Sequence, residues 1–260
     1  MTNDILLRHD HAGIATLTLN APASFNALSN AMIVALRDQI AALAQDQTTR
    51  VVILKGAGKA FCAGHDLKEM QAARAAADKG RAAFAALFAD CAAMMQALSA
   101  LPQPVIAQVH GVATAAGCQL VASCDLAVAA TGTRFGVNGI NIGLFCTTPM
   151  VALTRKIPPA VAFEMLSTGA FIDSTRARDA GLINRITAPE DLNAETLALA
   201  QTLAAKLPAA LRLGKAAFRA TAGLPTAEAY ALASAAMVEN IMADATNDGI
   251  TAFLEKRPPK

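Results

Sequence analysis

The stretch from Gln108 to Asp125 limits the possible folds more than any other part of the chain. It lies between two short apolar runs, 104–109 and 126–130, and this pattern predicts a strand, a tight turn, a short buried helix and a second strand. Residues 115–117, Ala-Ala-Gly, have almost no side chain. They let a ligand approach the free N–H groups at a helix start, where a carbonyl oxygen that becomes negative can be held. Tight packing of a buried helix explains the same small residues.

The rest of the chain reads as an α/β core followed by helices. Alternating runs predict a two-stranded start, Ser29 is a candidate helix cap, and a compact turn at 61–70 precedes a long helical region ending near Ala100. We expect residues 134–143 to be a glycine-rich connection. Only helical patterns follow residue 189, so we predict a core over 1–190 and a helical C-terminal region over 191–260.

Composition excludes several classes of protein. The net charge of +2, the single Tyr and the absence of Trp argue against nucleic-acid binding. The five cysteines are scattered without the spacing of a metal or redox site, so we expect reduced, buried thiols and no metal. Polar residues interrupt the most apolar region, and the first residues lack a signal pattern, so we expect no membrane span and a cytoplasmic protein.

Four motifs together resemble the crotonase, or enoyl-CoA hydratase/isomerase, superfamily. They are Asn-x-Pro-x-x-x-Asn-Ala-Leu at 20–28, Phe-x-Ala-Gly-x-Asp-Leu-Lys-Glu-Met at 61–70, Pro-Val-Ile-Ala at 104–107 and Gly-Cys-x-Leu-x-x-x-Cys-Asp at 117–125. The closing segment 249–257 also matches the family. More narrowly, residues 113–125 and 141–146 are similar to the branch called enoyl-CoA hydratase domain-containing protein 3.

The resemblance implies the fold and the ligand. The fold is a spiral of ββα turns closed by a helical C-terminal region that assembles homotrimers, which often pair into hexamers. The ligand is an acyl-CoA thioester, and no separate cofactor is expected because coenzyme A is part of the substrate.

The resemblance also implies which residues form the site. The thioester oxygen is expected between two backbone N–H groups, those of His65 and Ala116. Further residues match positions that line the CoA site or, for the last two, reach a neighbouring subunit's nucleotide: Ala23, Ser24, Phe25, Ala63, Asp66, Leu67, Lys68, Phe253 and Lys256.

The chain departs from the family at the two glutamates that hydratases use, which match Gln119 and Gly139 here. An amide cannot take a proton at neutral pH, and glycine offers no group. We expect the His65 side chain to point away from the site, and we expect Asn141 and Cys146 to line an acyl pocket. Asp66 is expected to be a helix cap, and we assign no general base.

Three functions therefore stay open. The first is an acyl-CoA enzyme of weak or altered activity, for which decarboxylation of a malonyl-type thioester is one possible reaction because the loss of CO₂ generates the enolate without a base. The second is an enoyl-CoA hydratase of fatty acid β-oxidation in which Gln119 orients water. The third is a non-catalytic acyl-CoA-binding subunit.

Overall fold

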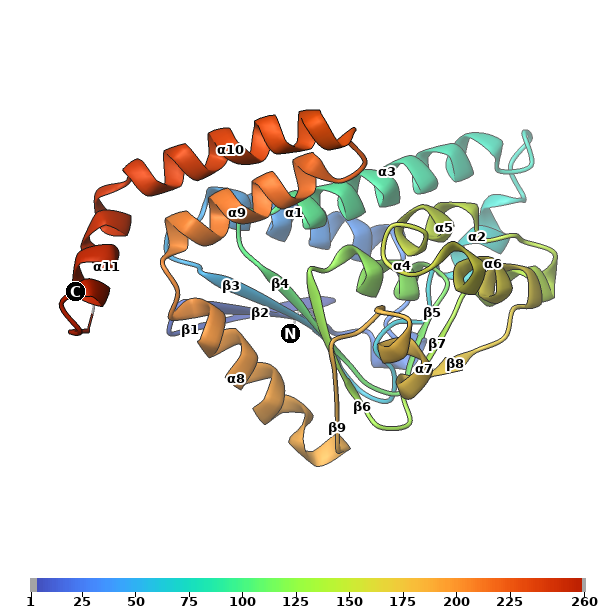
Figure 1. Cartoon of the computed structure of the whole chain (residues 1–260). Helices are drawn as coiled ribbons and strands as arrows, with labels where there is room; N and C mark the ends of the chain where they lie inside the picture. Colours follow the sequence, from blue (N-terminus) through green and yellow to red (C-terminus); the bar gives the residue numbers. More distant parts are fainter. Residues whose placement is uncertain (1–3, 259–260) are drawn as a thin grey trace.

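A six-stranded sheet forms the centre of the computed structural model, which describes residues 4–258 (Figure 1). The strands lie in the order β1-β2-β3-β4-β6-β9; β1 and β2 are antiparallel and all other neighbours are parallel. The predicted two-stranded start and the strands flanking the central stretch are confirmed. The strand bounds are Leu6–His11, Ile14–Leu19, Val51–Gly56, Val105–Val109, Leu126–Ala130 and Arg185–Thr187.

Apolar side chains cover both faces of this sheet because successive residues of a strand point to opposite sides. In β3, Val52 and Leu54 belong to the large core beneath α1 (Asn30–Gln45) and α3 (Arg81–Ala100). Their neighbours Val51 and Ile53 belong to a smaller core beneath α8 (Leu192–Ala204). The sheet is therefore a middle layer between helices.

The two long helices begin and pack largely as the sequence predicts. The Ser29 hydroxyl accepts a hydrogen bond from Met32 N at 3.2 Å and caps α1. By length and composition α3 is apolar enough to cross a membrane, but Leu87, Met94 and Leu98 on one of its faces belong to the protein core. A long apolar helix in the core of a protein has the same length and composition.

A smaller three-stranded sheet corrects one expectation. Residues 134–143 are not a simple connection, because β7 (Arg134–Gly136) pairs with β5 (Val112–Thr114) and β8 (Ile172–Asp173) before a 3-10 helix, η2 (Asn138–Ile142). These strands are too short for a local pattern, and their partners are distant in sequence. The helices around this sheet are α2 (Leu67–Ala73), α4 (Ala116–Ser123), α5 (Thr147–Leu153), α6 (Pro159–Thr168) and α7 (Ser174–Asp179).

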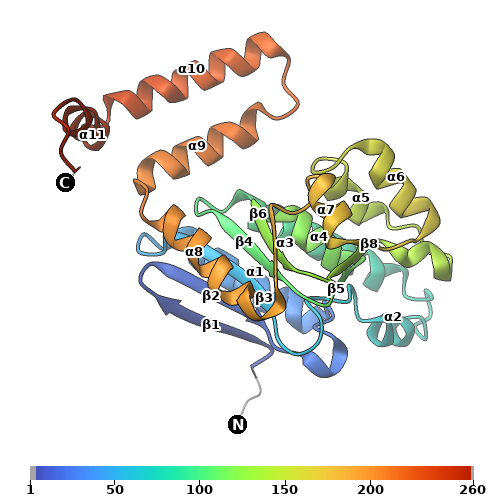
Figure 2. The ribbon, with the colours of Figure 1, turned by 60° about the horizontal axis from the view of Figure 1, so that its bottom comes forward.

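The C-terminal region begins on the sheet and then leaves it. After α8, the helices α9 (Pro208–Thr221), α10 (Thr226–Met242) and α11 (Asp244–Leu254) extend away from the body of the chain (Figures 1 and 2). Lys215 of α9 donates to Asp125 at 2.5 Å and to the Gln103 carbonyl at 2.8 Å, which ties this arm to the end of the central stretch.

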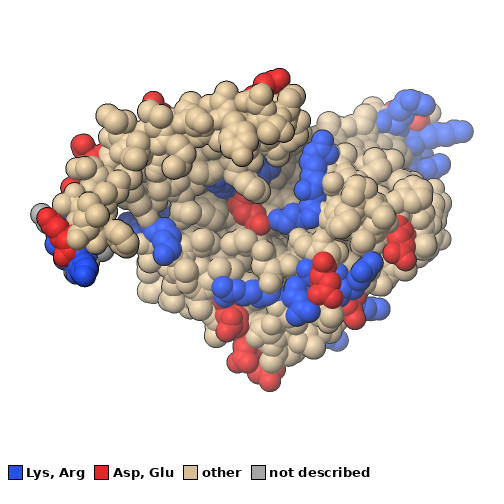
Figure 3. All heavy atoms as spheres, in the orientation of Figure 1, with Lys and Arg blue, Asp and Glu red and all other residues tan. Residues whose placement is uncertain are grey.

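The arm exposes many large apolar side chains. Figure 3 shows few charged atoms on the surface over α10. Phe218 and Phe253 are 79% and 83% exposed. More than half of the surface is also exposed at Tyr230, Met237, Ile241, Met242 and Leu254. An apolar surface of this kind is typical of a face that contacts another chain.

Candidate active site

Two turns with small residues lie against each other at the start of α4. A Cβ atom placed on Gly64 would be 2.9 Å from the Ala115 Cβ and 3.3 Å from the Ala116 nitrogen. A Cβ on Gly117 would be 2.2 Å from the Cys62 carbonyl oxygen. Larger residues at either glycine would push the turns apart, so both are needed for this close approach.

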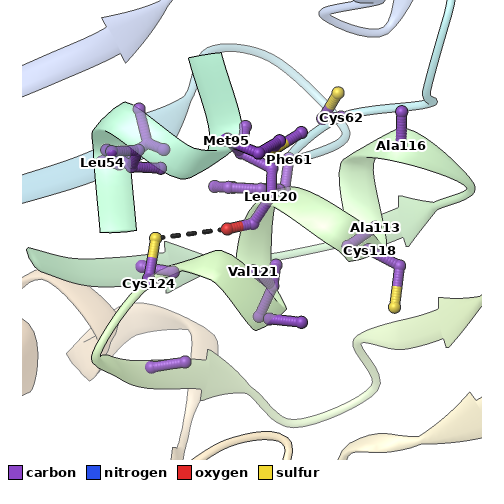
Figure 4. Close-up of a cluster of buried hydrophobic side chains, with 14 of the residues drawn as sticks. Leu54, Phe61, Cys62, Met95, Ala113, Ala116, Cys118, Leu120, Val121 and Cys124 are labelled. Atoms are coloured by element: carbon purple, nitrogen blue, oxygen red, sulfur yellow. Dashed lines mark hydrogen bonds between the residues drawn. The ribbon is translucent and has the colours of Figure 1, made fainter. Parts of the chain in front are cut away.

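The buried core holds the two turns in place. Figure 4 shows Leu120 and Val121 of α4 among buried side chains that include Phe61 and Cys62 of the other turn. The Thr114 N–H donates to the Cys62 carbonyl at 3.0 Å, which joins the segments just before α4 begins.

The backbone N–H groups of His65 and Ala116 are the two donors that the family resemblance implies. Within residues 4–258, neither N–H donates a hydrogen bond. Ala115 adopts φ 49° and ψ −121°, an uncommon conformation for a residue with a Cβ, and it turns the chain sharply into α4. Strained backbone of this kind is typical of functional sites.

Both N–H donors belong to residues that line one cavity of about 290 Å³. Among residues 4–258, no Asp, Glu, Lys or Arg lines it; the lining residues come mainly from α2, η2, α5 and the two turns. Gly139 and Leu67 line it as well, and its other walls are Ala63, Met70, Phe88, Thr114, Ala115, Asn138, Asn141, Ile142, Leu144, Phe145, Cys146, Thr147, Thr148 and Pro149. The cavity therefore offers hydrogen-bond donors without a fixed charge.

The His65 side chain corrects a second expectation, because it lines the cavity. Its ring contacts Phe88 edge to face, with the ring centroids 5.6 Å apart. Nδ1 lies 3.4 Å from the Leu28 carbonyl oxygen, and Nε2 is buried without a hydrogen-bond partner. An unsatisfied buried polar atom costs about 1–3 kcal/mol. Burial lowers the pKa of His65, although the Leu28 carbonyl opposes this shift, so the ring is neutral at neutral pH.

Cys146 is the other titratable residue that lines the cavity. Burial raises the pKa of its thiol, so it is protonated at neutral pH and is a poor nucleophile. The expectation that Asn141 and Cys146 line the pocket is confirmed. All five cysteines are free and buried, as predicted.

The structure separates the two positions that match the missing glutamates. Gly139 lines the cavity, but a Cβ there would be 2.4 Å from the Leu144 carbonyl oxygen and 2.8 Å from the Cys146 sulfur. Gln119 is buried in α4, its Oε1 has no hydrogen-bond partner, and it is not among the lining residues. The space beside Gly139 is thus already occupied by the loop that follows η2.

The loop around residues 23–25 supports the site from behind. Ala23 and Ser24 lie in a 3-10 helix, η1 (Pro22–Ser24), and the Phe25 carbonyl accepts the Ala63 N–H at 3.0 Å. The Leu28 N–H donates to the Gly64 carbonyl at 2.7 Å. None of the three residues 23–25 lines the cavity.

Asp66 caps α2, as predicted, by accepting the N–H groups of Lys68 and Glu69. The Lys68 side chain is on the exposed surface of this helix, whereas Leu67 reaches the cavity. Phe253 belongs to α11 and Lys256 follows that helix, which lies on the far side of the molecule from α2 (Figures 1 and 2). Neither residue is among those that line the cavity.

Several residues that line the cavity, among them Thr114 and Phe88, were not predicted from the sequence. Thr114 donates to Asn138 at 2.5 Å across the cavity wall, and no sequence signal links two residues on separate strands and turns. Phe88 lies in α3 among apolar residues that mostly belong to the core. Its place at the cavity is recognisable only from its contact with His65, which the sequence does not reveal.

Comparisons with known proteins identify the family. The enoyl-CoA hydratase/isomerase family model matches residues 9–260. Mouse enoyl-CoA hydratase domain-containing protein 3 is 42% identical over 95% of this chain and 81% of its own length. The chain belongs to the enoyl-CoA hydratase/isomerase family.

Solved structures agree with this family. An enoyl-CoA hydratase from Mycobacterium smegmatis is 50% identical with a TM-score of 0.95, each chain being 98% covered. Human enoyl-CoA hydratase domain-containing protein 3 is 40% identical with a TM-score of 0.93, covering 98% of this chain and 99% of the human one. The predicted crotonase fold and the narrower resemblance are confirmed. The mouse relative is named mitochondrial, so the cytoplasmic location predicted for this chain stays a prediction.

Proposed function

We propose that the protein binds an acyl-CoA thioester whose acyl group is uncharged, with the thioester carbonyl oxygen between the N–H groups of His65 and Ala116. The observation that carries this proposal is the contact between the two turns, which places two residues with unpaired backbone N–H groups in the lining of one cavity. Such preorganised donors stabilise the negative oxygen of an enolate, and removing one commonly costs about 100- to 1,000-fold in rate. No separate cofactor is part of the proposal.

The walls of the cavity favour weak or altered hydratase activity. Hydration requires a proton to leave water and another to reach the α-carbon, and no carboxylate lines the cavity to do either. Acid and base groups each contribute about 100- to 10,000-fold. An intact oxyanion hole without them gives a slow hydratase.

The same walls make a malonyl-type substrate less favourable than a simple acyl group. Its one free carboxylate would enter a cavity whose lining, among the described residues, has no Lys or Arg to pair with it. Decarboxylation and non-catalytic binding are therefore alternatives that the experiment below separates from hydration.

The proposed assembly is a homotrimer that pairs into a hexamer. Large apolar side chains on α10 and α11, including Met242 at 75% and Leu254 at 74% exposure, support burial against another copy. Phe253 and Lys256 lie on the same arm, so a neighbouring copy is the one whose CoA they would contact. Light scattering of the purified protein tests this, and a monomer at micromolar concentration would contradict it.

The test of function is turnover and binding on one sample. Crotonyl-CoA hydration is followed by loss of its ultraviolet absorbance, malonyl-CoA by release of CO₂, and both by calorimetry. We expect crotonyl-CoA to bind and to be hydrated slowly. Rapid hydration contradicts the reasoning about the absent carboxylates, CO₂ release favours the decarboxylase, and binding without either product favours the non-catalytic subunit. Failure to bind either thioester refutes the proposal.

A further inference from the structure

The hydrogen positions on His65 follow from its one polar contact. The Leu28 carbonyl oxygen only accepts hydrogen bonds, so an attractive contact with Nδ1 at 3.4 Å requires the proton on Nδ1. Nε2 of the neutral ring then carries a lone pair, and it has no partner in the protein. Nε2 is therefore a basic nitrogen that is not engaged in any hydrogen bond with the described residues.

The place of this ring relates it to the reaction. His65 lines the cavity, and its own backbone N–H is one of the two proposed oxyanion donors. Because the imidazole and that N–H belong to the same residue, a substrate held by the N–H would bind in the cavity that the ring lines. Nearby carboxylates are engaged elsewhere: Asp66 accepts the N–H groups that begin α2, and Glu69 accepts the Asn30 N–H at 2.8 Å.

From this arrangement we infer that the His65 imidazole transfers the protons in place of the two absent glutamates. This rests on the proposed function. Nε2 takes a proton from water as the water oxygen bonds to the β-carbon. The π electrons of the Cα=Cβ bond form the enolate, whose oxygen the His65 and Ala116 N–H groups hold. The imidazolium then gives its proton to the α-carbon, so one water is consumed and the ring is regenerated.

Nε2 is itself buried in this structure, so the ring must turn to present it to a substrate in the cavity. Nδ1 has a single long contact with Leu28, and the other contact noted for the ring is the edge-to-face one with Phe88. The proposal therefore includes a rotation of the ring on substrate binding, which breaks only the 3.4 Å contact of Nδ1 with the Leu28 carbonyl. Cys146, the other titratable lining residue, is kept protonated by burial and does not compete as a base.

The experiment measures proton removal without requiring hydration. Butyryl-CoA is incubated with the protein in D₂O, and exchange of its α-protons is followed by proton NMR while calorimetry measures its binding. His65→Gln keeps the backbone N–H but removes the base, and His65→Phe keeps a ring beside Phe88. His9→Gln, at an exposed position on β1, is the matched histidine control.

We expect the wild type and His9→Gln to exchange the α-protons, and both His65 variants to exchange them more slowly by a factor of at least about 100. The affinities of all variants for butyryl-CoA should stay within threefold of the wild-type value. Wild-type exchange falls as the ring is protonated at acid pH, and this dependence is absent from the variants. Exchange within threefold of wild type in both His65 variants overturns the inference, as does binding without exchange in the wild type. Failure to bind butyryl-CoA refutes the proposed function as well.

Discussion

Gly139→Ala tests whether the loop after η2 fills the place of the second family glutamate. The added Cβ would approach the Leu144 carbonyl oxygen to 2.4 Å, about 1 Å closer than an ordinary van der Waals contact, and the Cys146 sulfur to 2.8 Å. The Leu144 oxygen belongs to the backbone, so the backbone of the loop must shift even if the Cys146 side chain rotates away. Overpacking of this kind costs about 1–3 kcal/mol.

The expected result is a less stable protein with a damaged pocket. In a chain of this size each kcal/mol of lost stability lowers Tm by about 2–4 °C, so the Tm of the variant should be roughly 2–12 °C below that of the wild type. Because Leu144 and Cys146 line the cavity, crotonyl-CoA affinity measured by calorimetry should fall about tenfold, which corresponds to about 1.4 kcal/mol.

The matched control is Gly214→Ala, since a Cβ on Gly214 meets no atom within 4 Å. A Gly139→Ala protein with wild-type Tm and unchanged affinity would refute the packing described for this loop. For the same reason, Gln119→Glu combined with Gly139→Glu should not restore a fast hydratase, because the second glutamate has no room beside the Leu144 carbonyl.

Three further predictions concern stability. Gly214→Ala in exposed helix α9 should raise the free energy of unfolding by about 0.5–1 kcal/mol, and an unchanged or lower value in denaturant titration would contradict this. Lys215→Met should lower it by about 1–3 kcal/mol because Asp125 loses its closest cation; a variant as stable as wild type would show that this ion pair does not anchor α9. Because burial places the native pKa of His65 below its ordinary 6.5, the unfolded chain binds a proton that the native one does not as pH falls below 6.5. Stability should therefore fall in that range, and parallel pH curves for wild type and His65→Gln would contradict it.

Local patterns predict the elements that carry their own signal. The apolar period of α1, its Ser29 cap and the Asp66 cap of α2 depend on neighbouring residues, so the sequence is sufficient. The motif around Asn26 is recognisable, but its role is visible only in the fold. The Asn26 side chain accepts the Ala21 N–H and donates to the carbonyls of Ala57 and Ala60, which shapes the loop behind the site.

Features that depend on distant partners could not be predicted. The strand β7 exists because β5 and β8 pair with it, and its own three residues give no signal. The orientation of His65 depends on Phe88 and on the Leu28 carbonyl, which come from separate elements. Likewise, only the fold reveals that Leu144 and Cys146 fill the space beside Gly139.

The most direct test of the central claim is the carbonyl stretch of bound thioester. Crotonyl-CoA labelled with ¹³C at the thioester carbon is added to the protein, and the isotope-edited infrared difference spectrum isolates that bond. Two hydrogen bonds from His65 and Ala116 weaken the C=O bond, so we predict a stretch at lower frequency than that of the thioester free in water. A bound thioester that absorbs at the free frequency or above it would contradict the account, because its oxygen would then lack both donors.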